Sequence, residues 1–336
     1  MKKLFPALVV ATLCFTHPAW GKNGSGQVTM AFDLSGQPAD QVVRLWIPYP
    51  VSDQNQLIDR IGFNGDFSEA GVYTEPAEGN AILYAAWPKA SKSRRLTLSF
   101  RVQRRDLRRG PLPDSEPDWN PADYARFLAP TSLGPTDGAV KELADKIVAG
   151  KTTVLDRARA IYDWTVENMY RDPDTRGCGK GDVCYLLIRP GGKCTDISSV
   201  FVALCRAAGV PAREVFGLRL GKQARQDITT WQHCWSEFFL PGFGWVPADP
   251  ADVLKAMLVE KLPLDSPRIV ELRDYFWGGI DADRFKLATG RDLVLNPLQA
   301  GDPLNTFGYP YAEVGGKPLD FYDPQNFTYR FTFRPL

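Results

Sequence analysis

One cysteine stands where it could carry out nucleophilic chemistry. Cys194 opens a predicted helix directly after Gly191-Gly192-Lys193. The unpaired N–H groups and the dipole at a helix N-terminus stabilise a thiolate, which is the reactive form of cysteine. A buried, inert cysteine is the commoner case, and Cys205 fits it because it falls on the apolar face of the same helix. Cys194 precedes that face, so we predict that it is the reactive thiol.

His233 is the candidate base for this thiol. The sequence contains two histidines, and the other one, His17, lies in an N-terminal segment that we expect to be removed. A nucleophilic cysteine needs a base, and the base needs a group that orients it. A lone histidine in a strand is more often a packing residue. The cysteine upstream favours the catalytic interpretation, so we predict that His233 accepts the proton of Cys194.

Two carboxylates compete for the orienting role. A predicted hairpin follows His233, and a tight turn at its centre would place His233 opposite Asp252. A turn centred on Pro241 would place it opposite Asp249 instead. Pro250 cannot donate a ladder hydrogen bond, so regular pairing should stop before Asp252. Asp249 could also be a simple turn residue at a strand exit. We favour Asp249 as the orienting residue.

Periodic apolar patterns predict the elements that would position this site. Apolar residues within 197–208 recur at spacings of three and four, which predicts a helix with one buried face. Gly209 favours the left-handed conformation that ends helices, and Pro211 prevents continuation. The period then changes to two, which predicts strands over 214–218, 231–240 and 245–247. The cysteine is thus expected on a helix and the histidine on a sheet.

The sequence indicates more than one structural part. Residues 22–108 contain alternating runs separated by Gly and Asn clusters, which predict an antiparallel β domain. Residues 109–121 are rich in Pro and Asp and form the predicted linker. We expect the catalytic core over 122–310. Residues 311–336 should form a C-terminal β segment that completes one of the sheets.

The N-terminus indicates export. Two lysines precede a mostly apolar stretch from Leu4 to Phe15, and the small residues Ala19 and Gly21 stand where a signal peptidase would recognise them. The apolar stretch is too short to span a bilayer comfortably. We therefore predict a signal peptide over residues 1–21 and a periplasmic or secreted protein without a membrane span.

The composition excludes some classes of partner. The formal net charge is +1 at pH 7, so the sequence does not indicate binding to nucleic acid or to an anionic membrane surface. The hydrophobic fraction of 44% is typical of a globular protein with a substantial core.

Five cysteines remain once the predicted signal peptide is removed, and an odd number leaves at least one without an intrachain partner. In an oxidising compartment we expect a disulfide between Cys178 and Cys184. Cys234 could pair with Cys205 or stay reduced. A zinc site is not expected. Cys178 and Cys184 are spaced more widely than a usual pair of zinc ligands, and a single histidine is available.

Two segments resemble the transglutaminase-like superfamily. Gly191-Gly192-Lys193-Cys194-Thr195-Asp196, followed by residues 204–213, is similar to its nucleophile helix. Residues 233–250, which begin HCWSEFF and end WVPADP, are similar to its histidine and aspartate hairpin. The resemblance covers residues 140–250. It implies an α+β fold with a papain-like core, and it assigns Cys194 as nucleophile, His233 as base and Asp249 as orienting acid.

The resemblance also implies the reaction. In this superfamily a thiolate attacks an amide carbonyl, a thioester forms, and water or an amine releases it. We therefore expect an exported cysteine hydrolase or acyltransferase with a peptide or protein amide as substrate, and no metal or cofactor. The donor that stabilises the oxyanion has no clear counterpart, and Tyr185 and Trp231 are the candidates.

Two alternatives remain open. Arylamine N-acetyltransferase also has a Cys-His-Asp triad, but it uses a cytosolic thioester donor, which conflicts with export. A non-catalytic binding module could keep the same scaffold. The intact set of Cys194, His233 and Asp249 favours an enzyme over such a module.

Overall fold

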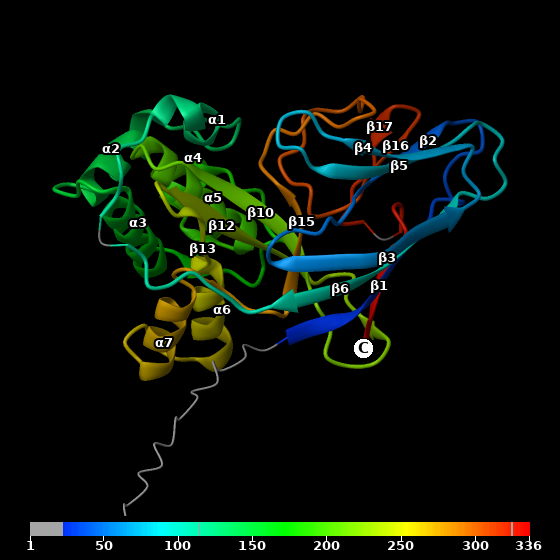
Figure 1. Cartoon of the computed structure of the whole chain (residues 1–336). Coiled ribbons are helices and arrows are strands. Elements are labelled where there is room, and N and C mark those ends of the chain that lie inside the picture. Colours follow the sequence, from blue (N-terminus) through cyan, green and yellow to red (C-terminus); the bar gives the residue numbers. More distant parts are fainter. Residues whose placement is uncertain (1–22, 114, 324) are drawn as a thin grey trace, which may run out of the picture.

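The computed structural model describes residues 23–113, 115–323 and 325–336. The predicted signal peptide, residues 1–21, lies outside this range. Figure 1 shows a region rich in helices beside a region built of strands. In the part of the chain that the structure describes, no helix is long and apolar enough to cross a membrane.

Two five-stranded antiparallel sheets form the strand region, which we call the sandwich. Their orders are β11-β18-β1-β6-β3 and β17-β16-β2-β5-β4. The strands are β1 (Asn23–Asp33), β2 (Val43–Pro48), β3 (Gln56–Gly65), β4 (Glu69–Thr74), β5 (Ala81–Trp87), β6 (Arg95–Arg105), β11 (Gln226–Asp227), β16 (Tyr311–Val314), β17 (Lys317–Pro318) and β18 (Tyr329–Pro335).

Apolar side chains on the facing sides of the two sheets make the core of the sandwich. Every second residue of β6 from Leu96 to Val102 is buried, as the period of two predicts. These side chains belong to the same buried cluster as Leu45 and Leu83 of the second sheet. The predicted antiparallel β structure of the N-terminal region is therefore confirmed.

The sandwich takes strands from distant parts of the chain. β18 pairs with β1, and β16 pairs with β2. β11, which comes from the middle of the chain, pairs with β18 in the same sheet. The strands of residues 22–108 therefore do not complete either sheet alone. The boundaries of the N-terminal β domain at 22–108, the linker at 109–121, the catalytic core at 122–310 and the C-terminal segment at 311–336 stay predictions.

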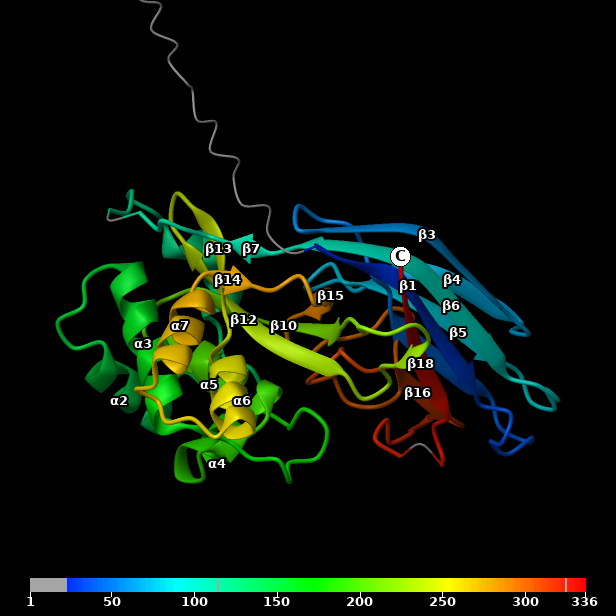
Figure 2. The same ribbon diagram turned by 90° about the horizontal axis from the view of Figure 1, so that it is seen from below.

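A four-stranded antiparallel sheet and the surrounding helices form the other region. The sheet has the order β13-β12-β10-β15, and Figures 1 and 2 both show it between the helices and the sandwich. Its strands are β10 (Ala212–Arg219), β12 (Gln232–Leu240), β13 (Gly244–Ala248) and β15 (Arg284–Thr289). This arrangement confirms the predicted α+β fold.

The helices of this region are η1 (Pro121–Tyr124), α1 (Ala125–Leu128), α2 (Gly138–Ile147), α3 (Val154–Asn168), α4 (Val183–Ile188), α5 (Cys194–Ala207), α6 (Pro250–Glu260) and α7 (Pro267–Tyr275). Two small sheets pair β7 (Leu107–Arg108) with β14 (Gly279–Ile280) and β8 (Tyr170–Arg171) with β9 (Gly191–Gly192).

Helix α5 is the central element of the helix-rich region. Every residue of α5 is buried, and the helix packs against β10 and β12. It ends where the sequence predicts. Gly209 has a φ of 73°, and the N–H of Val210 donates to the carbonyl of Cys205 at 2.8 Å, which is the Schellman arrangement. Packing on all sides therefore fixes the position of the cysteine that opens this helix.

Candidate active site

Cys194 is the first residue of α5. The carboxylate of Asp196 accepts hydrogen bonds from the backbone N–H groups of Lys180 and Gly181, at 3.0 and 2.7 Å. These bonds tie the loop before α4 to the first turn of α5. Gly179 permits this approach, because a Cβ atom at that position would lie 1.8 Å from the Asp196 carboxylate. The backbone around the thiol is thus fixed from both the helix and the loop.

His233 and Asp249 are in direct contact. Nε2 of His233 lies 2.8 Å from Oδ2 of Asp249, and both side chains are buried. The pKa of the Cys194 thiol is lowered by Cys178 and Cys234 and, to a smaller extent, by His233, so the imidazole is close to the thiol. Oδ1 of Asp252 is farther away, 3.7 Å from Nε2. The structure therefore places His233 in contact with Asp249 and near Cys194.

The hairpin of β12 and β13 has a register that we did not predict. Leu240 lies opposite Gly244, which centres the turn on Gly242. The prediction of a turn centred on Pro241 is therefore wrong by one residue. The pairing ends at Ala248, before the proline, as we expected.

Asp249 reaches the imidazole from the start of a helix and not from a strand. Its Oδ1 caps α6 by accepting the N–H of Asp252 at 3.0 Å, while its Oδ2 contacts His233. One carboxylate thus starts the helix and faces the imidazole, and the cap fixes the direction of the carboxylate.

A fully buried arginine, Arg284, binds the carboxylates around His233. Its guanidinium donates to Asp249, to Asp252 at 2.6 Å and to Asp281. The sequence did not indicate this residue, because nothing in the alternating pattern of β15 distinguishes it from a surface arginine. The cation compensates the negative charge that surrounds the imidazole.

Charge compensation also keeps Asp252 ionised. A second guanidinium, that of Arg219, lies 2.6 Å from its carboxylate. Burial alone would raise the pKa of Asp252, but Arg219 and the neighbouring cations hold that pKa well below its usual range. Asp249 and Asp252 lie close enough to His233 for a metal site, yet arginines already occupy their oxygens.

Three buried thiols meet at the start of α5. The Sγ atoms of Cys178, Cys194 and Cys234 lie within 4.8 Å of one another. Tyr309 donates its hydroxyl to Sγ of Cys178 at 3.2 Å. Hydrogen bonds from Cys178 and Cys234, with that of His233, hold the pKa of Cys194 well below its usual range. The contact with Cys194 raises the pKa of Cys178.

The predicted disulfide between Cys178 and Cys184 is not formed. Both residues are free thiols in the structure, and Cys184 is exposed on α4 while Cys178 is buried beside Cys194. The prediction failed because closeness in sequence does not bring the two sulfur atoms together once α4 forms. Cys205 and Cys234 are also free and buried.

A cavity of about 490 Å³ opens onto Cys194. This volume lies within the usual range for sites that bind small ligands or short peptide segments. Aromatic side chains and cations predominate in its wall, and the described residues that line it include no carboxylate. They are Arg171, Arg176, Gly177, Cys178, Lys193, Cys194, Thr229, Thr230, Gln232, Tyr309, Phe321, Tyr322 and Tyr329.

The two candidates for the oxyanion donor are not among the described residues that line this cavity. Tyr185 is exposed on α4, and Trp231 packs against the core of the sandwich. The role of an oxyanion donor stays a prediction for both residues. The next residue, Gln232, does line the cavity, and its side-chain nitrogen donates to the carbonyl of Thr229 at 2.9 Å.

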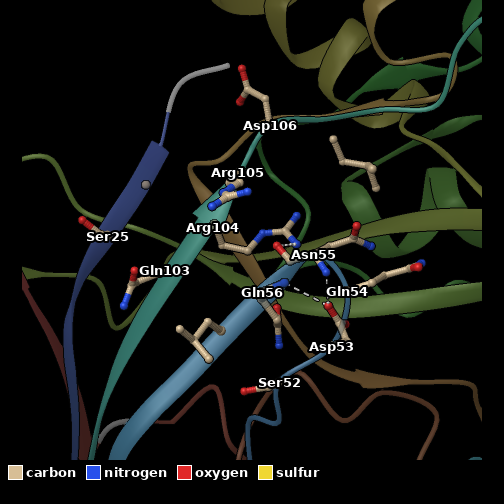
Figure 3. Close-up of a pocket in the computed structure, with 13 residues that line it drawn as sticks. Ser25, Ser52, Asp53, Gln54, Asn55, Gln56, Gln103, Arg104, Arg105 and Asp106 are labelled. Carbon is tan, nitrogen blue, oxygen red and sulfur yellow. Dashed lines mark hydrogen bonds between the residues drawn. The ribbon is translucent and has the colours of Figure 1, made fainter. Parts of the chain in front are cut away.

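A second cavity, of about 510 Å³, lies elsewhere. Figure 3 shows polar side chains around it, including Gln54 in the turn before β3 and Gln103 near the end of β6. Arg104 lines it and donates through Nε to the carbonyl of Arg284 at 2.8 Å. None of the three predicted catalytic residues is among the described residues that line it. A choice of site by cavity volume alone would therefore miss Cys194.

Comparisons with known proteins agree with this geometry. The family model of the transglutaminase-like superfamily matches residues 141–250. An uncharacterized protein of Haemophilus influenzae is 38% identical over 336 aligned residues, which cover 92% of this chain and 91% of that protein. YebA, an uncharacterized protein of Bacillus subtilis, is 30% identical over 125 residues, which cover 33% of this chain and 17% of YebA.

A solved structure shares the fold. The crystal structure of a candidate cysteine protease from Cytophaga hutchinsonii matches this chain with a TM-score of 0.52 and 17% sequence identity. The match covers 93% of this chain and 98% of that one. The common architecture therefore extends beyond the residues of the family match and includes most of the sandwich.

Proposed function

Because the chain belongs to the transglutaminase-like superfamily, we propose that it is a cysteine-dependent enzyme that hydrolyses amide bonds or transfers their acyl groups. In this proposal Cys194 is the nucleophile, His233 is the base and Asp249 orients the base. The substrate is a peptide or protein amide.

One observation carries the proposal: His233 contacts a buried carboxylate and lies near the thiol. Its Nε2 lies 2.8 Å from Asp249, and the imidazole is among the groups that lower the pKa of Cys194. A carboxylate in this position selects the tautomer with a proton on Nε2, which leaves Nδ1 free to accept the thiol proton. The pKa of Cys194 is lowered and the thiol faces a cavity. A purely structural cysteine or a binding module would need neither property.

The proposed reaction follows from these positions. The thiolate of Cys194 attacks the amide carbonyl carbon, and His233 gives its proton to the leaving amine. The acyl group is then held as a thioester. Water or a second amine attacks the thioester while His233 takes the proton of that nucleophile, and the thiolate is released. Asp249 orients the imidazole and stabilises the imidazolium.

We also propose that residues 1–21 direct export and are then removed, so that the enzyme acts in the periplasm or outside the cell. The charged start and the short apolar stretch of this segment support the proposal. Sequencing the N-terminus of protein recovered from the periplasm should give a chain that starts near residue 22. Recovery of the full-length chain in the cytoplasm alone would contradict it.

Trapping the thioester tests the enzymatic proposal. The protein is mixed with an activated peptide amide such as a p-nitroanilide, quenched in acid and mapped by mass spectrometry. We expect an acyl adduct on Cys194, and none in the Cys194→Ala or His233→Ala variants. Cys184→Ala is the control, because Cys184 is exposed and away from the cavity. An adduct on Cys184, or an adduct that persists in His233→Ala, would contradict the assignment.

A further inference from the structure

Cys178 is a buried thiol that the proposed reaction does not use. Its Sγ lies with those of Cys194 and Cys234 in the cluster whose members are within 4.8 Å of one another. Only two of these thiols, Cys178 and Cys194, are among the described residues that line the 490 Å³ cavity. A small molecule that reaches Cys194 through the cavity therefore meets Cys178 beside it.

The backbone holds Cys178 next to the first turn of α5. The carbonyl of Cys178 accepts the N–H of Thr195 at 2.9 Å. The flanking residues Gly177 and Gly179 have φ values of 57° and 91°, a conformation that favours glycine. A Cβ atom at residue 177 would lie 2.0 Å from the ring of Tyr322. These glycines thus allow the loop to pass between its neighbours and bring Cys178 to the nucleophile.

We propose that Cys178 is the partner with which Cys194 forms a reversible disulfide when a peroxide enters the cavity. The inference rests on the proposed role of Cys194 as the reactive thiol. A disulfide at this place blocks attack on an amide and also protects Cys194 from irreversible oxidation. The pair is a modification site within the proposed active site.

The two steps balance with hydrogen peroxide as the oxidant. The Cys194 thiolate attacks one peroxide oxygen, the O–O bond breaks, hydroxide leaves, and Cys194 becomes a sulfenic acid. The sulfur of Cys178 then attacks the sulfur of Cys194. The S–S bond forms, the S–O bond breaks, and the hydroxyl group leaves as water with the proton of the Cys178 thiol. A dithiol reductant reduces the disulfide back to the two thiols.

Cys178 is favoured over Cys234 as the partner because of its backbone and its access. Cys234 lies in β12, where pairing with Phe216 of β10 fixes its backbone. Its sulfur also lies 3.2 Å from Oγ1 of Thr195, and it is not among the described residues that line the cavity. Cys178 lies in a loop between β8 and α4, and its sulfur contacts the Tyr309 hydroxyl at 3.2 Å and the Gln232 carbonyl at 3.6 Å. Unlike Cys234, it lines the cavity, and the disulfide requires its sulfur to move from within 4.8 Å to about 2.05 Å of Cys194.

Peptide mapping after peroxide treatment tests the proposal. The full chain with Cys184→Ser, which removes the exposed thiol, is treated with hydrogen peroxide in the presence of a chelator. We expect a mass loss of about 2 Da, a linked pair of peptides that contain Cys178 and Cys194, and full return of both thiols with dithiothreitol. In a further Cys178→Ser variant, Cys194 should instead gain about 32 Da as a sulfinic acid that dithiothreitol does not reduce.

Each other outcome has a definite meaning. A peptide link between Cys194 and Cys234 overturns the choice of partner. A sulfinic acid on Cys194 with Cys178 still free in the parent protein overturns the disulfide itself. If Cys194 is neither oxidised by peroxide nor alkylated by iodoacetamide while the protein remains folded, its role as the reactive thiol fails, and the inference fails with it. The first two results leave the proposed enzymatic function intact.

Discussion

The two sides of the candidate active site are held by different forces. On the sheet side, the imidazole of His233 is fixed by buried ions, chiefly Asp249 and Arg284. On the helix side, Cys194 is surrounded by the thiols of Cys178 and Cys234, which are weak hydrogen-bond donors. Loss of the partner of a buried ion has a large free-energy cost, whereas loss of a thiol contact has a small one. The structure thus fixes the direction of the base and leaves the charge of the nucleophile adjustable.

The largest expected effects are on turnover and come from the sheet side. His233→Ala should abolish acylation of Cys194. Asp249→Asn should lower the rate about 10³- to 10⁴-fold, as loss of the orienting carboxylate does in the serine-protease triad. Asp252→Asn should cost far less, because Asp252 is 3.7 Å from the imidazole. Single-turnover acylation rates measure all three, and a silent Asp249→Asn beside a damaging Asp252→Asn would reverse the assignment.

The next effect is on stability. Arg284→Met removes a fully buried cation and leaves the carboxylates that it binds without compensation. We expect a loss of about 3 to 5 kcal/mol in the free energy of unfolding, measured by urea denaturation. Arg330→Met is the matched control, because the ion pair of Arg330 with Asp227 is solvent-exposed and should contribute about 0 to 1 kcal/mol. Equal losses in the two variants would show that the buried network has no special role.

The pH dependence of stability should reveal the same network. The pKa of Asp252 is well below its usual range in the folded chain. Its contribution is therefore fully present above the unfolded value of about pH 4 and is lost as the pH falls below it, because the unfolded chain takes up the proton first. Urea denaturation at pH 5 and pH 3 should show a smaller loss of stability in Asp252→Asn than in the unsubstituted protein.

Asp265→Asn is the control for this experiment. Asp265 is exposed, and no ion pair of the described chain includes it. Its variant should follow the unsubstituted protein at both pH values. A pH dependence that is equally steep in Asp252→Asn would contradict the depressed pKa.

The smallest effect belongs to the helix side. Cys234→Ala removes a neighbouring thiol that helps to lower the pKa of Cys194, so the pKa of that thiol should rise. The rate of alkylation by iodoacetamide should then fall by up to about tenfold at pH 6 and recover at pH 9. Cys184→Ala should change neither rate. A loss that is the same at both pH values would indicate a blocked cavity rather than a shifted pKa.

Local signals made part of this site predictable from the sequence. The start and the glycine stop of α5 lie within a single run of residues, and so do the strand with His233 and the turn after it. Asp249 before Pro250 carried a further signal, because a capping residue followed by proline is typical of a helix start. We read this pair as a strand exit, and α6 and α7 were not predicted.

The rest of the site depends on contacts between distant residues. Arg284 reaches Asp249 from another strand, and Tyr309 reaches Cys178 from a segment outside the family match. Neither residue differs in its local pattern from an ordinary arginine or tyrosine. Their roles arise only when the four-stranded sheet and the C-terminal segment come together around α5.

The interleaved strands of the sandwich also set an order for folding. β18 is the last strand along the chain, yet it lies inside its sheet, between β1 and β11. The N–H and C=O groups on one edge of β1 stay unpaired until residues 329–335 have been synthesised. Such an edge invites pairing with other chains, and contacts between distant residues form slowly. β1 therefore depends on β18, a strand made much later, and completion of this sheet is a late event in folding.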